Sequence, residues 1–119
     1  MRILVVDDDP AIRDISARIL SHAGFAVDVA ADGESAWDAF LLHHYDLVVT
    51  DQNMPRLDGS GLIERVRNTG TKTPVILMTG GTTNPSSLSI TPDIFLSKPF
   101  SFSVLIDAAN RLLCKAAAA

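Results

Sequence analysis

The chain has 119 residues, 47% of them hydrophobic, and its 10 Lys and Arg against 14 Asp and Glu give a formal net charge of −4. This length suits one domain with a single core and leaves no room for a second folded unit. The negative charge disfavours direct nucleic-acid binding, and no apolar run approaches the roughly 18 residues of a membrane helix. We expect a cytoplasmic protein without membrane insertion.

The first part of the chain alternates strand and helix patterns. The apolar run 3–6 predicts a strand that leads directly into an acidic triplet. Asp9-Pro10 is typical of a helix N-cap and first turn, and Gly24 is a natural helix stop. The segment 25–29 indicates a half-exposed edge strand, and the apolar spacing over 34–43 predicts a second helix.

The alternation continues in the second part of the chain. The run 47–50 has the composition of a central parallel strand that is covered on both faces. A short helix is predicted after the loop 55–59, and two further strands over 75–78 and 94–97. A final helix is predicted over 103–113. Alternating strands and helices favour a doubly wound α/β domain.

One segment departs from this alternation. Residues 80–92 are rich in Gly, Pro, Ser and Thr, which disfavour helix. We therefore expect the helix between the last two strands to be short, missing or disordered. We assign residues 1–114 to the domain and 115–119 to an Ala-rich tail.

Polar side chains directly follow four of the predicted strands: Asp7, Asp8, Asp51, Thr79 and Lys98. The carboxyl ends of parallel strands lie on one edge of the sheet, so these side chains should converge. Carboxylates about 4 Å apart repel by roughly 4 kcal/mol at a surface-like dielectric, so a cation is needed among them. Mg2+ (or Mn2+) with oxygen ligands fits such a set, which is suited to receive a phosphoryl group.

At this point the chain resembles the response regulator receiver domains of two-component signalling, which are CheY-like. The resemblance rests on four motifs in family order: Val6-Asp7-Asp8, Val49-Thr50-Asp51-Gln52-Asn53-Met54-Pro55, Met78-Thr79-Gly80 and Lys98-Pro99-Phe100. It implies a flavodoxin-like, doubly wound five-stranded parallel sheet in the order 2-1-3-4-5, with helices on both faces.

The resemblance also implies a role for each residue of the acidic cluster. Asp51 would be the phosphoacceptor, whose carboxylate attacks phosphorus to form an aspartyl phosphate. Asp8 would bind Mg2+ directly, and Asp7 directly or through a water molecule. Asp51 and the backbone carbonyl of Asn53 would complete the protein ligands.

Further roles implied by the resemblance concern signalling. Thr79 and Lys98 would bind phosphoryl oxygens, and Thr79 and Phe95 would form the conformational switch. The phosphoryl donor would be a sensor histidine kinase or a histidine phosphotransfer protein, and the downstream target would be a protein that the sequence does not identify. Such a module is a signalling domain that assists its own phosphorylation and dephosphorylation rather than an enzyme, and a homodimer is possible.

Two other classes of protein share some of these features. A haloacid-dehalogenase-like phosphatase also uses an Asp nucleophile with Mg2+, but it requires an acid two residues later, where this chain has Asn53. A flavodoxin-like FMN-binding module is suggested by the Gly- and Thr-rich loop after Thr79, because such loops cradle phosphate. In flavodoxins, however, that loop follows the first strand, which here ends in three acids. Read alone, the acidic triplet 7–9 would only be a capped helix start, and Lys98 a solvated surface lysine.

Overall fold

The protein is described from a computed structural model over residues 1–80, 91–98 and 101–118. The five strands are β1 (Arg2–Val6), β2 (Ala26–Ala30), β3 (Leu47–Asp51), β4 (Val75–Thr79) and β5 (Ile94–Ser97). The four helices of these ranges are α1 (Pro10–His22), α2 (Gly33–Leu42), α3 (Gly59–Asn68) and α4 (Phe102–Ala118). All strand pairs are parallel and the sheet order is β2-β1-β3-β4-β5, which confirms the predicted topology.

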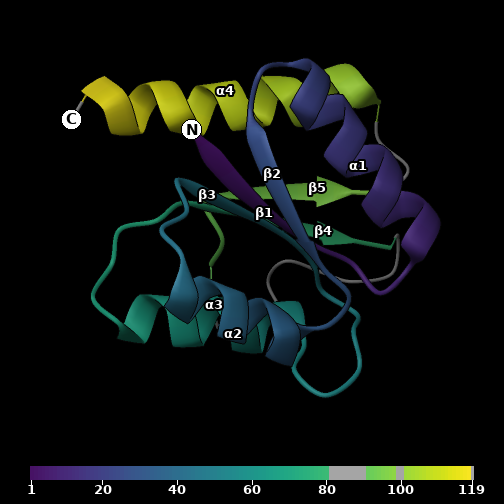
Figure 1. Cartoon of the computed structure of the whole chain (residues 1–119), viewed down its shortest axis with the longest axis vertical. Helices are drawn as coiled ribbons and strands as arrows, with labels where there is room; N and C mark the ends of the chain where they lie inside the picture. The colour runs from purple at the N-terminus through teal and green to yellow at the C-terminus, as the bar shows by residue number, and fades with distance from the viewer. Residues whose placement is uncertain (81–90, 99–100, 119) are drawn as a thin grey trace.

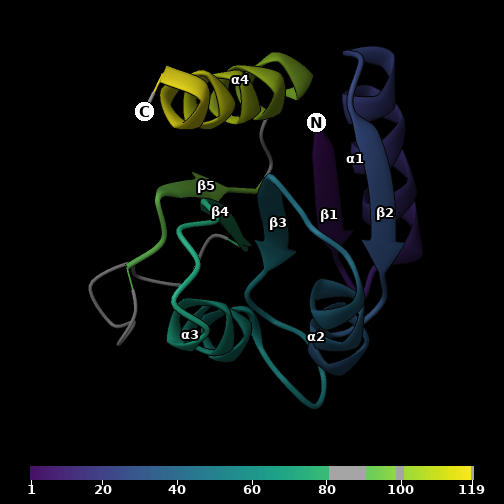
Figure 2. The same cartoon turned by 60° about the vertical axis from the view of Figure 1, so that its left-hand side comes forward.

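Helices cover both faces of the sheet, with α1 and α4 on one side and α2 and α3 on the other (Figures 1 and 2). Successive side chains of a strand point to opposite faces. Ile3 and Val5 of β1 therefore pack in the core that contains Leu105 of α4, whereas Leu4 and Val6 pack in the core under α2 and α3. The central strands are buried on both faces, as their continuous apolar runs predicted.

The chain enters α1 through the N-cap predicted from its sequence. The Asp9 carboxylate accepts hydrogen bonds from the backbone N–H groups of Ala11 (2.9 Å) and Ile12 (3.5 Å), and Pro10 occupies the first helical position. The buried face of α1 differs from a simple apolar stripe. Ser16 is buried, whereas Ile15 is 43% exposed beside the groove between α1 and α4.

Two further expectations concern the later part of the chain. The predicted loss of a helix over 80–92 falls almost entirely on residues 81–90, which lie outside the described residues. The last helix is longer than the predicted 103–113 because it continues through Ala118. Alanine has the highest helix propensity, which favours this extension into the tail. Within the described residues, no helix is both long and apolar enough to cross a bilayer.

Candidate functional site

Three carboxylates meet at the carboxyl edge of the sheet. The register pairs Val6 of β1 with Thr50 of β3, so the residues that follow, Asp7 and Asp51, lie side by side. Asp7 is fully buried, Asp51 is 5% exposed, and Asp8 lies on the surface. One carboxylate oxygen from each of the three lies within 4.8 Å of the others. The convergence predicted from the strand ends is therefore present.

Lys98 bridges two of these carboxylates. It follows β5 directly, and its ammonium Nζ lies 3.1 Å from Asp7 Oδ2 and 3.1 Å from Asp51 Oδ1. The side chain is 20% exposed, so this ion pair is largely shielded from solvent. The backbone N–H of Lys98 donates to the Thr79 carbonyl at 2.7 Å, which ties the lysine to the end of β4. Lys98 is thus a member of the cluster rather than a solvated surface lysine.

The Asp7 carboxylate is held on both of its oxygens. Oδ1 accepts the backbone N–H of Asp9 at 2.9 Å, and Oδ2 accepts the Lys98 ammonium. The Arg13 guanidinium, one turn into α1, donates to the Asp7 carbonyl at 3.0 Å. The acidic triplet therefore serves two purposes, since Asp9 caps the helix while Asp7 and Asp8 belong to the cluster. The sequence reading missed Arg13, for which the only signal is its position one helical turn after the N-cap.

The electrostatics of the cluster favour an added cation. Burial raises the pKa of the Asp51 carboxyl; the hydrogen bond from Lys98 opposes this rise, and the charges of Asp7 and Asp8 reinforce it. For Lys98, burial acts to lower the pKa, but hydrogen bonds to Asp7 and Asp51 outweigh it and raise the pKa overall. The cluster holds three carboxylates and one ammonium, which contacts only Asp7 and Asp51, so added positive charge would favour ionisation of Asp51.

Thr79 contributes an unpaired hydroxyl. Its side chain is 1% exposed, and Oγ1 has no hydrogen-bond partner within the described ranges. A buried hydroxyl without a partner carries a free-energy cost, so its presence calls for a functional explanation. Thr79 lies at the end of β4, between the strands that deliver Asp51 and Lys98. An oxygen-rich ligand at this edge would give the hydroxyl an acceptor.

Two predicted site residues lie outside this cluster of side-chain contacts. Asn53 is exposed in the loop that follows β3, and the proposed use of its backbone carbonyl as a metal ligand stays a prediction. Phe95 of β5 is partly buried and packs against the core under α2 and α3. Its proposed role in switching also stays a prediction. The sequence reading did not single out Gln52, a buried amide directly after Asp51.

The carboxylate cluster has the composition of a site for a hard divalent cation. Such ions take oxygen ligands, and Mg2+ is typically held by one or two carboxylates together with phosphate oxygens and water. The carboxylate oxygens of Asp7, Asp8 and Asp51 are close enough to share one ion. The raised pKa of Asp51 is consistent with a site that requires one. The residues therefore fit Mg2+.

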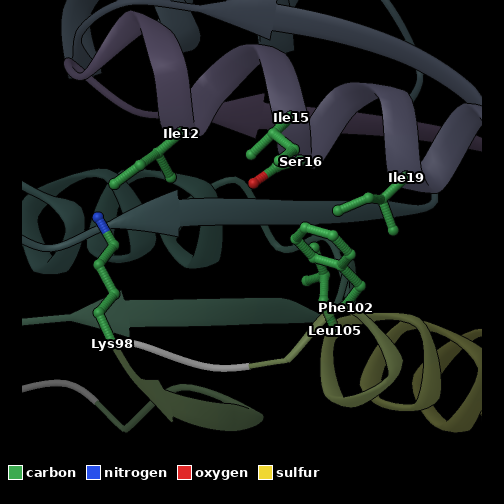
Figure 3. Close-up of a pocket in the computed structure, with 7 residues that line it drawn as sticks. All are labelled: Ile12, Ile15, Ser16, Ile19, Lys98, Phe102 and Leu105. Atoms are coloured by element: carbon green, nitrogen blue, oxygen red, sulfur yellow. The ribbon is translucent and has the colours of Figure 1, made fainter.

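An apolar pocket of about 390 Å³ adjoins the cluster between α1 and α4 (Figure 3). It is lined by Ile12, Ile15, Ser16, Ile19, Lys98, Phe102 and Leu105. Lys98 lies at one end, so the pocket and the carboxylate cluster share this side chain. Phe102 is 52% exposed at the rim, so part of the apolar surface faces solvent.

A parallel five-stranded sheet with three carboxylates, a bridging lysine and an unpaired threonine at its carboxyl edge defines an α/β domain of the CheY-like class. Residues 3–110 match the family model of the response regulator receiver domain. The chain therefore belongs to the response regulator receiver family of two-component signalling.

Individual relatives agree with this assignment. The response regulator MprA of Mycolicibacterium vanbaalenii is 38% identical over 116 residues, which cover 95% of this chain and 50% of the relative. The chain thus spans about half the length of the curated relatives that it matches. The receiver domain of the Francisella response regulator 1452 superposes with a TM-score of 0.89 at 32% identity, covering 97% of this chain and 98% of that one. The response regulator TrrA of Thermotoga maritima, solved in complex with Mg2+-BeF, gives a TM-score of 0.88 at 35% identity, covering 94% and 98%.

Proposed function

We propose that this chain is the phosphoacceptor of a two-component system or phosphorelay, with Asp51 as the residue that receives the phosphoryl group. The observation that carries the proposal is the bridge from Lys98 to Asp51 and Asp7 within the carboxylate cluster. The bridge supports the proposal because it joins, at one sheet edge, a carboxylate that could act as nucleophile, an ammonium that could bind phosphoryl oxygens and carboxylates that could bind a metal. Thr79 adds a buried hydroxyl that has no hydrogen-bond partner among the residues that the structure describes.

The proposed reaction is transfer of a phosphoryl group from a phosphohistidine to Asp51. An Asp51 carboxylate oxygen attacks phosphorus and forms a P–O bond, while the P–N bond breaks and its electron pair returns to the imidazole, which takes up a proton. Lys98 and Thr79 bind the phosphoryl oxygens and orient the group for attack. Asp7, Asp8, Asp51 and the Asn53 carbonyl would hold Mg2+, which when bound would supply positive charge to offset the charge that develops during transfer.

The phosphodonor is proposed to be a sensor histidine kinase or a histidine phosphotransfer protein. The pocket between α1 and α4 supports docking of such a partner beside the acceptor, because Lys98 belongs to both the pocket and the cluster. Exposed Ile15 and Phe102 provide apolar surface for the side chains that flank a phosphohistidine. We also propose that the protein is cytoplasmic and does not bind nucleic acid directly. On this proposal it is a signalling module and not an enzyme.

Phosphorylation is proposed to act on conformation through Thr79 and Phe95. A phosphoryl group on Asp51 would offer the Thr79 hydroxyl the acceptor that it lacks, and this would draw the end of β4 toward the acceptor. Phe95 is partly buried and has no hydroxyl that would need a partner, so it can follow this movement within the core. The surface that changes would then engage a protein target or a second copy of the chain.

The proposal is tested by locating the phosphoryl group. The protein is incubated with acetyl phosphate and Mg2+, the acyl phosphate is reduced with borohydride, and the modified residue is identified by peptide mass spectrometry. We expect reduction of Asp51 alone. Modification of Asp7 or Asp8 would overturn the proposal. So would the absence of any modified carboxylate when acetyl phosphate and a phosphohistidine donor are each tried.

A further inference from the structure

The residue directly after Asp51 ties the end of β3 to the start of α3. Gln52 is only 9% exposed, and its side-chain Oε1 accepts the backbone N–H of Ser60 at 2.8 Å. Its Nε2 donates to Ser60 Oγ at 3.2 Å, and its carbonyl accepts the N–H of Gly59 at 3.0 Å. Three hydrogen bonds therefore join the residue that follows β3 to the first turn of α3.

These bonds extend into the N-cap of α3. Ser60 Oγ donates to Asp58 Oδ1 at 3.1 Å, and Asp58 Oδ1 also accepts the backbone N–H of Gly61 at 2.8 Å. The helix start also packs closely on the acceptor backbone, since a Cβ at Gly59 would lie 2.4 Å from the Asp51 carbonyl oxygen. The first turn of α3 therefore lies close against the backbone of Asp51.

The loop closed by these bonds, residues 53–58, is conformationally strained. Arg56 has a φ of 70°, in the left-handed region that residues other than glycine rarely adopt. Such a conformation costs on the order of 1–3 kcal/mol and persists only where the surrounding structure fixes it. The Gln52–Ser60 bonds close the loop, whereas the Arg56–Asp32 ion pair, at 3.8 Å and with a largely exposed Arg56 side chain, contributes little.

The Gln52 side-chain amide forms specific hydrogen bonds in addition to filling space. A buried amide contributes to stability only when its polar atoms are bonded, and an apolar residue of similar size would fill the same space without that requirement. Both polar atoms of the Gln52 side chain are bonded, and both bonds go to Ser60. The side chain therefore orients the loop relative to Asp51 as well as filling space.

We propose that Gln52 is a positioning residue, which holds the loop 53–58 so that the Asn53 backbone stays in place beside the carboxylates. This inference rests on the proposed function, because it concerns the metal that the carboxylates bind. Removing a residue that orients a metal ligand typically lowers metal affinity 10- to 100-fold. Loss of the Gln52 side-chain bonds should weaken Mg2+ binding and leave the chemistry at saturating Mg2+ unchanged.

The test titrates the full chain with Mg2+ by isothermal calorimetry, alongside urea unfolding and the rate of Asp51 labelling at saturating Mg2+. Gln52→Met keeps the volume and removes both side-chain bonds, so its Mg2+ dissociation constant should rise about tenfold. Ser60→Ala removes only the hydroxyl and should give a smaller rise. Thr69→Val is the matched control, because it removes a 2.6 Å hydrogen bond to the Val66 carbonyl at the other end of α3. Its Mg2+ affinity should equal that of the wild type.

Other outcomes of these titrations would overturn the inference or the proposed function. A wild-type dissociation constant in folded Gln52→Met, or an equal loss of affinity in Thr69→Val, overturns the inference and leaves the proposed function standing. If Gln52→Met does not fold, Ser60→Ala becomes the test. Its Mg2+ affinity should then be lower than that of the wild type, and an unchanged affinity overturns the inference. A wild-type protein that does not bind Mg2+ overturns the proposed function and the inference together.

Discussion

Replacing the Asp51 carboxylate should make the metal-free protein more stable. In Asp51→Asn, the remaining cluster loses two repulsions, each between carboxylate oxygens no more than 4.8 Å apart, and each worth about 3.5 kcal/mol at an effective dielectric of 20. It also loses the attraction to Lys98 at 3.1 Å, which is worth about 5.4 kcal/mol on the same scale. The net gain is about 1.5 kcal/mol, to which relief from burying an ionised group adds.

The assay is urea unfolding of both proteins in EDTA, followed by the same measurement with Mg2+. In EDTA the urea midpoint of Asp51→Asn should be higher than that of the wild type, and a thermal scan should show a melting temperature raised by roughly 6 °C for a chain of this size. With Mg2+ at about a hundredfold excess over its dissociation constant, the wild type gains about 2.7 kcal/mol by binding. The variant lacks one metal ligand and should gain less stability from Mg2+. The stability difference between the two proteins should therefore shrink or reverse.

The dependence on pH has a definite sign. Because the pKa of Asp51 is raised in the folded state, the folded protein holds this proton more tightly than the unfolded chain does. The wild type should therefore lose stability relative to Asp51→Asn as pH rises from about 4, the unfolded pKa, through the higher folded pKa. A variant as stable as the wild type or less stable in EDTA would refute this reasoning. Asp14→Asn, an exposed carboxylate whose side chain is 65% accessible, is the control and should change stability by less than about 0.5 kcal/mol.

Three further changes test other parts of the structure. Thr79→Val replaces the unpaired hydroxyl by a methyl group of similar size, so the unphosphorylated protein should keep its stability or gain up to about 1 kcal/mol, while Asp51 labelling slows. A large loss in urea unfolding would show that the hydroxyl is bonded after all. Gly59→Ala would place a methyl group 2.4 Å from the Asp51 carbonyl oxygen, so unfolding should show a loss of about 2 kcal/mol or more. Tyr45→Phe removes a 2.7 Å hydrogen bond to Asp28 and should cost about 1 kcal/mol at neutral pH. That bond is the main cause of the lowered pKa of Asp28, so the cost should fade as pH drops below about 4, and a cost that persists in acid would contradict this origin.

The positions of the site residues were predictable because strand ends can be read from apolar runs. The runs before Asp7, Asp51, Thr79 and Lys98 each indicated a strand, and a parallel sheet necessarily brings their carboxyl ends to one edge. The capping role of Asp9 followed from Pro10 in the same way. These features depend on local pattern and topology, which the sequence carries directly.

Features that depend on side-chain reach were not predictable. Arg13 and Gln52 act through hydrogen bonds to the Asp7 carbonyl and to Ser60, and no local pattern in the sequence specifies those partners. The exposure of Ile15 and the burial of Ser16 depend on how α1 lies against α4, which the spacing of apolar residues along one helix does not specify. The metal ligand proposed at Asn53 is a backbone atom, so it was expected from the family resemblance and not from a side-chain pattern.

The most direct test of the central claim is an intact-mass measurement of the wild type and of Asp51→Asn after incubation with acetyl phosphate, in Mg2+ and in EDTA. We predict a gain of one phosphoryl group in the wild type with Mg2+, and none in the other three samples. An equal gain in Asp51→Asn, or a gain that does not depend on Mg2+, would contradict the assignment of Asp51 as acceptor and of the carboxylate cluster as its metal site.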